Sequence, residues 1–267
     1  MPNDHLLRSP AFLATHQYAD SRNLGNRSSL HDRYSSAAEP FRVWEARLVD
    51  WSDGIEVLEV GAGPGQFWTS GMVPRSAHVT VSDLSPGMVR EAVARVTEEG
   101  YASTSGLVCD ALALPCADAQ YDMVVANHML YHVPDPAAAL AEFRRVLRPG
   151  GTALIATNAP GHMRQLSEVI TDVYGSSPSI LNSVFGIDNG ELMLRDHFTA
   201  IVWHSFVNPL MVNDVGALVA YASSLPPVST GAPDQLQELR RAFEARLSAD
   251  GGQFRIDTRA GAFVCRT

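Results

Sequence analysis

One short segment, residues 57–65 with the sequence VLEVGAGPG, constrains the fold of this chain more than any other. The run 55–60 is apolar and rich in β-branched residues, which predicts a buried strand of a parallel sheet. Gly61, Gly63 and Gly65 follow directly and predict a turn in which the backbone comes close to another group. A strand, a glycine turn and a helix are the arrangement by which α/β sheets hold nucleotide-like ligands.

The glycine spacing separates classes of nucleotide-like ligand. The dinucleotide fingerprint G-x-G-x-x-G requires a third glycine at position 66, where this chain has Gln66. The observed pattern is E-x-G-x-G-x-G and starts at Glu59. A tight turn that binds no ligand is also compatible with these glycines.

Strands and helices alternate over residues 55–157, which predicts a parallel sheet with helices on both faces. The pattern loosens after residue 160, where short helical pieces are separated by glycines. Later segments predict one strand, two helices and a last strand, at 198–206, 213–224, 233–249 and 254–265. We therefore expect four parts, namely an N-terminal helical cap, a ligand-binding α/β core, a lid insertion and the remainder of the core with strands 6 and 7, at 1–50, 51–160, 161–197 and 198–267.

Charge and composition restrict the partners. The chain has 267 residues, and its net charge of -9 opposes nonspecific binding to nucleic acid or anionic lipid. Arg144, Arg145 and Arg148 belong to one predicted helix and form no basic cluster. A small-molecule substrate is therefore favoured, and we expect a monomer or a homodimer.

The same composition suggests a cytoplasmic protein. No apolar run approaches the ~18 residues of a membrane helix, and the first residues lack a signal-peptide pattern. Cys109, Cys116 and Cys265 are odd in number and form no C-x-x-C pair, so we expect reduced thiols and no metal site.

Two acids follow predicted strands. Asp83 comes just after a strand at 77–82, where one carboxylate can accept hydrogen bonds from both ribose hydroxyls. Nicotinamide-binding folds use an acid here too, and a helix cap beside Ser85 is the alternative. Asp110 follows a strand at 105–109 and can accept from an adenine amine, with an ordinary loop aspartate as the alternative.

Three further segments occur in order after the glycine turn. They are DLSPGM at 83–88, YDMVVANHMLYHVPD at 121–135 and RVLRPGG at 145–151. With the glycine turn, they resemble the motifs of the UbiE-like, methyltransferase type 11 branch of class I S-adenosylmethionine (SAM) dependent methyltransferases. The resemblance covers about residues 55–157 and implies a Rossmann-like, doubly wound sheet of seven strands, mostly parallel with an antiparallel last strand.

The resemblance also implies the cofactor and its contacts. SAM would be the methyl donor and S-adenosyl-L-homocysteine the product. The residues carried over by motif position are Glu59, Gly61, Gly63 and Gly65 for the methionine end, Asp83 for ribose, Leu84 and Met88 for the adenine face, Asp110 and Ala111 for the adenine edge, and Asn127 and His128 beneath the sulfonium. Glu59 stands where the family often has Asp, which changes its reach rather than its role.

The N-terminal segment adds candidates of its own. Arg27, His31 and Tyr34 are spaced i, i+4 and i+7, so they share one face of a predicted helix. We expect this face to cover the amino-acid end of the cofactor, with Arg27 pairing its carboxylate and Tyr18 as a further contact. A solvated polar face is the alternative interpretation.

Methyl transfer requires alignment above all, because the methyl group leaves a sulfonium in an in-line displacement. An oxygen or activated-carbon acceptor also benefits from a base, for which His132 and His128 are the candidates, although either can be a structural histidine. We expect an enzyme acting on a bacterial specialised metabolite. The alternatives are a SAM-fold protein that catalyses a non-methylating step such as cyclisation, a nicotinamide-dependent oxidoreductase and a non-catalytic binding protein.

Overall fold

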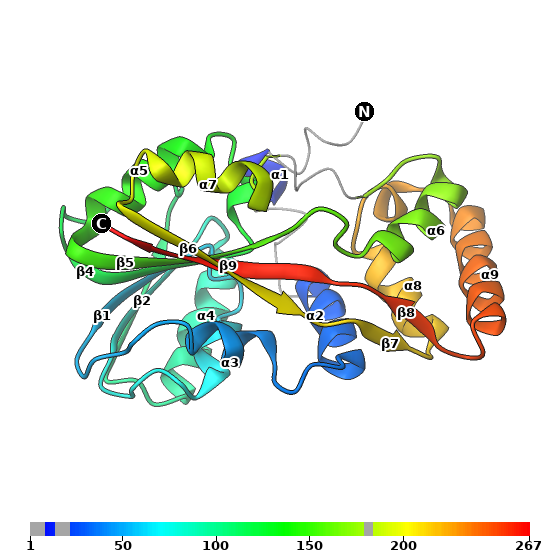
Figure 1. Cartoon of the computed structure of the whole chain (residues 1–267), viewed down its shortest axis with the longest axis horizontal. Helices are drawn as coiled ribbons and strands as arrows, with labels where there is room; N and C mark the ends of the chain where they lie inside the picture. Colours follow the sequence, from blue (N-terminus) through cyan, green and yellow to red (C-terminus); the bar gives the residue numbers. More distant parts are fainter. Residues whose placement is uncertain (1–8, 14–21, 179–183) are drawn as a thin grey trace.

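A seven-stranded sheet forms the centre of the structure, a computed structural model that describes residues 9–13, 22–178 and 184–267 (Figure 1). Its strands are β1 (Glu56–Val60), β2 (His78–Asp83), β3 (Ser103–Val108), β4 (Tyr121–Asn127), β5 (Leu147–Asn158), β6 (Ala200–Val207) and β9 (Arg259–Arg266). They are ordered β3-β2-β1-β4-β5-β9-β6, and β9 runs antiparallel to both of its neighbours while the other pairs are parallel. The predicted α/β sheet with an antiparallel last strand is confirmed.

Helices connect these strands. They are α1 (Pro10–Phe12), α2 (Arg22–Tyr34), α3 (Phe41–Ala46), α4 (Pro86–Glu98), α5 (Pro136–Val146), α6 (Arg164–Tyr174), α7 (Ile187–Arg195), α8 (Val215–Ser223) and α9 (Pro233–Ala249), with short 3-10 helices η3 (Gln66–Ser70), η4 (Leu130–His132) and η6 (Val228–Thr230). None of the helices in the described parts of the chain is long and apolar enough to cross a membrane.

Side chains along a strand point alternately to the two faces of the sheet, and both faces are buried along the central strands β1, β4 and β5. On one face, Leu58 of β1 and Val124 of β4 pack in a cluster with α5 and α7. On the other face, Val57 and Val125 pack with α3, α4 and η3. This two-sided burial explains why the strand segments read as nearly continuous apolar runs in the sequence.

A third cluster lies beside the sheet and combines α2, α6, α8 and α9 with a separate two-stranded sheet of β7 (Leu210–Val212) and β8 (Phe254–Ile256) (Figure 1). The expected division at 161–197 and 198–267 stays a prediction. Of the expected lid, α6 joins the third cluster, whereas α7 packs on α5. Residues 210–256 belong to the third cluster rather than to the sheet.

The expected last strand, 254–265, is also two strands rather than one. β8 pairs with β7, and β9 enters the main sheet after the two intervening residues. Gly261 lies inside β9, where a Cβ would collide with the carbonyl oxygen of His204 and the ring of Trp203. The glycine therefore permits a close approach of β6 rather than ending a strand.

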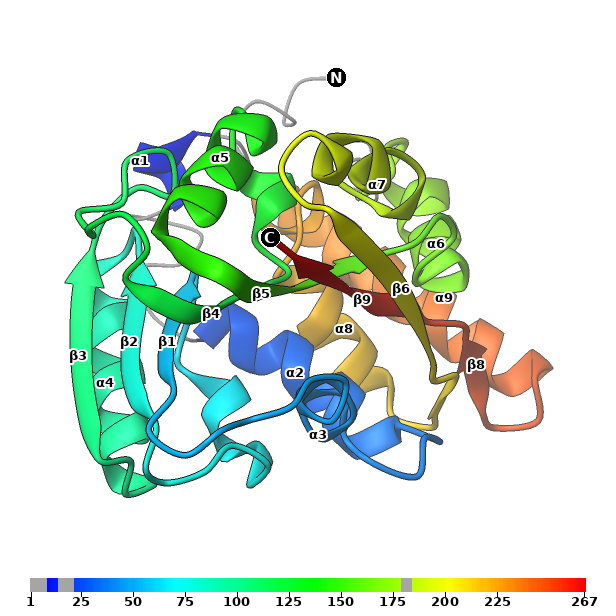
Figure 2. The same ribbon diagram turned by 60° about the vertical axis from the view of Figure 1, so that its left-hand side comes forward.

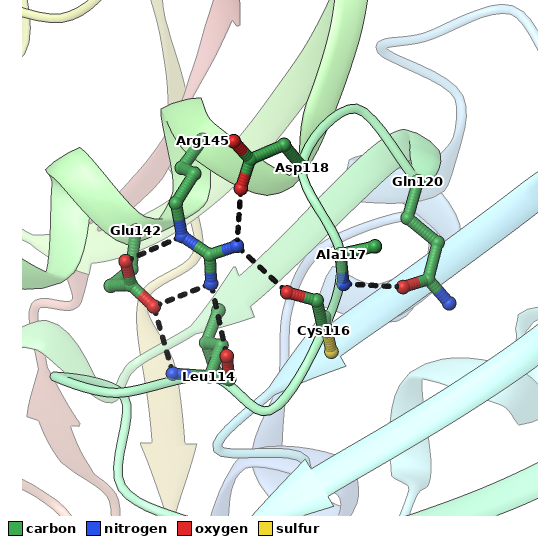
Figure 3. Close-up of polar contacts among 7 residues, drawn as sticks. All are labelled: Leu114, Cys116, Ala117, Asp118, Gln120, Glu142 and Arg145. Carbon is green, nitrogen blue, oxygen red and sulfur yellow. Dashed lines mark hydrogen bonds and ion pairs between the residues drawn. The ribbon is translucent and has the colours of Figure 1, made fainter.

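Arg145 of α5 fixes the long loop between β3 and β4 (Figure 3). Its guanidinium donates to both carboxylate oxygens of Glu142, at 2.7 and 2.8 Å, and to Asp118 at 2.8 Å. It also donates to the carbonyl oxygens of Leu114 and Cys116, at 2.9 and 2.7 Å. This arginine of the RVLRPGG segment is therefore a structural anchor for the loop that follows the third strand.

The packing of α4 on β3 leads to a test of the fold. A Cβ at Gly106 would lie 2.6 Å from Val93 Cγ2 and 2.7 Å from Val89 Cγ1, so Gly106→Ala should lower the free energy of unfolding by about 1–3 kcal/mol. The same change at Gly25, an exposed helical glycine with nothing within 4 Å of its Cβ position, should raise it by roughly 0.5–1 kcal/mol. Urea denaturation measures both values. An unchanged or increased stability of Gly106→Ala would contradict this packing.

Candidate active site

The carboxyl ends of the parallel strands open onto one cavity of about 760 Å³. The segments that follow β1, β2, β3, β4 and β5 all contribute to its wall, as do α2, α3, β6 and α8. In Figure 2, α2 and α8 lie side by side close to this edge of the sheet. Because parallel strands place their carboxyl ends on one edge, residues from distant segments meet here.

The turn after β1 takes the conformation that its glycines permit. Gly61, Gly63 and Gly65 have φ values of 67°, 53° and 74°, in the left-handed region that other residues rarely adopt. A Cβ at Gly61 would lie 2.7 Å from the Cβ of Met129, and one at Gly63 would lie 3.3 Å from Leu24 Cδ1. The glycines therefore let α2 and the segment after β4 approach this turn.

Asp83 connects the glycine turn to the end of β2. Its carboxylate accepts the backbone N–H of Gly63 at 3.0 Å and that of Ser85 at 2.9 Å. Burial raises the pKa of Asp83, although these backbone hydrogen bonds act in the opposite direction. The cap of α4 is Ser85, whose hydroxyl accepts from the N–H of Met88, so Asp83 is not that cap. Asp83, Leu84 and Met88 all line the cavity.

Asp110 and Ala111 line the cavity after β3, next to Cys109. The carboxylate of Asp110 accepts the backbone N–H of Leu112 at 3.0 Å, which fixes its orientation. Ala111 is buried against the first face cluster. These residues therefore lie on the same cavity as Asp83, as the motif positions predict.

Glu59 is a buried acid at the end of β1. It is 2% exposed, and its carboxyl accepts a 2.6 Å hydrogen bond from the indole N–H of Trp68. Burial raises the pKa of Glu59 to about 8, so the carboxyl is mostly protonated at neutral pH. Its partner Trp68 was not expected from the sequence.

Asn127, His128 and His132 line the cavity after β4. Asn127 Oδ1 is buried and makes no hydrogen bond to any described residue. His128 has an unusual φ of 54°, and its backbone N–H donates to the carbonyl oxygen of Ala156 at 3.0 Å. The ring of His132 packs on that of Tyr131, with centroids 4.8 Å apart.

Three histidines from distant segments surround one part of the cavity. His31 of α2 stacks on His162 of the β5–α6 loop, with ring centroids 6.1 Å apart, and His128 lies in the same wall. Burial lowers the pKa of His31 and of His128 to about 4, and it lowers that of His162 well below its usual value. All three rings are therefore neutral at pH 7.

His162 also has an assigned orientation, because its Nδ1 accepts the backbone N–H of Arg259 at 3.1 Å. In the neutral ring the proton then lies on Nε2. His162 was not predicted as a site residue from the sequence. Its position just beyond the fifth strand, at the edge where the other cavity residues lie, could have indicated this role.

The predicted helix face of Arg27, His31 and Tyr34 exists in α2 but faces α8. Arg27 donates to the carbonyl oxygen and hydroxyl of Ser224, at 2.8 and 3.0 Å. Tyr34 donates to the carboxylate of Asp214 at 3.3 Å. Arg27 lines the cavity, but these donors hold α2 against α8. Tyr18 lies outside the described residues.

Other cavity residues were also missed. Those that contribute charged, amide or aromatic groups include Phe41, Arg42, Glu45, Asn158, Phe206, Asn208 and Tyr221. Asn158 ends a strand at the ligand edge, which was a usable signal. Glu45 and Arg42 lie in a six-residue helix that matches no motif, so nothing in the sequence singled them out.

The chain was compared with known proteins. Residues 58–155 match the family described as "Methyltransferase domain". The UbiE ubiquinone/menaquinone C-methyltransferase of Paracoccus denitrificans is 36% identical over 120 residues, which cover 43% of this chain and 48% of that protein. Aklanonic acid methyltransferase DauC of a Streptomyces species is 33% identical over 129 residues, which cover 46% and 58%. The chain spans about half the length of the curated relatives that it matches.

A solved structure shares the fold. A putative methyltransferase from Bacillus halodurans superposes with a TM-score of 0.61 at 18% identity, over 85% of this chain and 98% of that one. Such low identity shows the fold alone. The order of the motifs, the strand order of the sheet and the matched domain together show that residues 58–155 form a methyltransferase domain of the class I SAM-dependent kind, similar to the UbiE-like, methyltransferase type 11 branch, whose cofactor is SAM.

Proposed function

We propose that this chain transfers the methyl group of SAM to a small-molecule acceptor, releasing S-adenosyl-L-homocysteine. The observation that carries the proposal is the single cavity that joins the glycine turn to the three histidines. Its volume of about 760 Å³ lies within the roughly 300–1,000 Å³ of small-molecule sites. A net charge of -9 also favours a small molecule over a nucleic acid.

In this proposal the cofactor lies along the ends of β1, β2 and β3. Asp83 receives the ribose hydroxyls, and Asp110 with Ala111 contacts the adenine edge. The glycine turn, with Glu59, holds the methionine end, and Asn127 lies beneath the sulfonium. The support is that these residues line one cavity on adjacent strand ends, apart from Gly65 of the turn, which packs against Ala92 of α4.

The acceptor would occupy the opposite part of the cavity. Aromatic rings of Phe41, Phe206 and Tyr221 line it from α3, β6 and α8. Such a wall suits a flat, largely apolar molecule. The relative named aklanonic acid methyltransferase supports an acceptor from bacterial specialised metabolism.

Catalysis would rest on alignment, with a histidine as base when the acceptor is a hydroxyl. His128 and His132 are the proposed bases. A neutral ring can accept a proton, and the low pKa of His128 keeps it neutral over the physiological range. The same low pKa makes His128 a weak base, which leaves the larger share of this role to His132.

The test is methyl transfer from radiolabelled SAM to a panel of phenols, hydroxyquinones, carboxylic acids and amines. The wild-type protein should label at least one of them. Gly63→Val should abolish labelling while the far-ultraviolet circular dichroism stays native, because its side chain would strain a φ of 53° and press on Leu24. A variant that labels at the wild-type rate would show that this turn does not hold the cofactor.

With a hydroxyl acceptor, the same assay tests whether a histidine acts as the general base. His132→Ala should lower kcat by about 10²–10⁴ and leave cofactor affinity nearly intact. His197, which does not line the cavity, provides the control. Losses below about tenfold for both His132→Ala and His128→Ala would reduce these rings to positioning residues.

The neutral state of the histidines has its own test. Because the folded-state pKa values lie below the usual 6.5, the unfolded chain binds more protons between about pH 4 and 6.5. The contribution of the neutral histidines to the free energy of unfolding is therefore complete above pH 6.5 and is lost as the pH falls toward 4. Between pH 7.5 and 5, wild type should lose about 1–2 kcal/mol more unfolding free energy than His162→Gln.

Urea denaturation at the two pH values measures this difference. Glutamine can still accept the N–H of Arg259, so the substitution removes the titration with little change of shape. His197→Gln should behave as the wild type does. Equal losses for wild type and His162→Gln would show that folding does not lower the pKa of this ring.

A further inference from the structure

Helix α3 presents an arginine and a glutamate to the cavity. Arg42 and Glu45 are three residues apart, so they lie on one face of the helix, and both line the cavity wall. Neither has a place in the family motifs, and neither is used in the function proposed above.

Glu45 carries a buried carboxyl oxygen that no described residue pairs. The residue is 1% exposed, and its Oε1 makes no hydrogen bond to any described residue. Buried polar atoms are nearly always hydrogen-bonded, because leaving one unpaired costs free energy. An unpaired carboxyl oxygen in a cavity wall therefore points to a donor that a ligand supplies.

Arg42 also has a buried polar atom that no described residue pairs. One of its terminal nitrogens, Nη1, lies 3.5 Å from Asp32 Oδ1 at the surface. Its Nε is buried and makes no hydrogen bond to any described residue. A guanidinium offers planar donors that match a carboxylate, so the inner side of Arg42 suits an anionic oxygen pair.

The charges around Glu45 define what it can bind. Glu59 of β1 faces it, Asp83 acts on Glu59 from β2, and His128 lies against Phe41 of α3. Burial and the nearby Glu59 raise the pKa of Glu45 well above its usual value. Two buried acids side by side favour a cation between them, and such a cation would convert them from acids to carboxylates.

We propose that Arg42 and Glu45 form a clamp for the α-amino-acid end of SAM, with Arg42 pairing the carboxylate and Glu45, together with Glu59, pairing the α-ammonium. The assignment deepens the proposed function and rests on it. It replaces Arg27 as the carboxylate partner, because Arg27 donates to Ser224. When the ammonium binds, the acids release protons to solvent, so binding becomes linked to pH.

Calorimetry with two ligands tests the clamp. S-adenosyl-L-homocysteine carries the amino-acid group, whereas 5′-methylthioadenosine has the same nucleoside without it. Arg42→Gln and Glu45→Gln should each weaken S-adenosyl-L-homocysteine binding about tenfold or more and leave 5′-methylthioadenosine binding within about twofold. Arg47→Gln, on an exposed arginine at the end of α3 that pairs with Glu39, should change neither affinity.

Proton release gives a second readout in the wild-type protein. In two buffers of different ionisation enthalpy at pH 7, S-adenosyl-L-homocysteine should release protons and 5′-methylthioadenosine should release none. This readout tests whether the buried acids Glu45 and Glu59 pair the ammonium even if Glu45→Gln fails to fold, and Arg42→Gln tests the carboxylate half.

The outcomes separate the two proposals. If wild type binds S-adenosyl-L-homocysteine with no proton release and both variants keep its preference over 5′-methylthioadenosine, the clamp is wrong while the function stands. If wild type binds neither nucleoside, the proposed function itself is overturned.

Discussion

The ligand edge of this protein depends on a backbone turn that only glycine forms without strain. Three left-handed glycines follow β1, and the N–H of the middle one, Gly63, donates to Asp83 at the end of β2. The turn and the neighbouring strand end are thereby held as one unit. Leu24 of α2 and Met129 after β4 pack where side chains on this turn would be. The cavity exists because the backbone makes room for these neighbours.

Buried ionisable groups of both kinds surround the same cavity. Glu45 and Glu59 have raised pKa values and His31, His128 and His162 have lowered ones, because burial disfavours every charged form. At neutral pH the cavity therefore holds less charge than its residue types suggest. In the proposed clamp, a cationic cofactor would reverse this state at the acidic end, so that binding would be linked to pH.

The centre of the sheet was predictable because strands β1, β4 and β5 are buried on both faces, so their sequences are largely apolar. The residues of the motifs meet at one edge because parallel strands place their carboxyl ends there. The third cluster was not predictable, since its helices and β7–β8 pack through side-chain complementarity that leaves no periodic signal. The helix of Arg27 was predicted, but its partner Ser224 lies 197 residues away. Arg145 was expected on a helix, yet its loop-anchoring contacts required the fold.

The central claim is that one cavity at this edge holds the cofactor between the glycine turn and the α2–α3 segment. Hydrogen–deuterium exchange with and without saturating S-adenosyl-L-homocysteine tests it most directly, because exchange reports on each segment separately. We expect slower exchange in residues 59–65, in 83–88 and in α2, with no change in α9. Binding that leaves the glycine turn and α2 unprotected, or that protects α9 instead, would contradict the account.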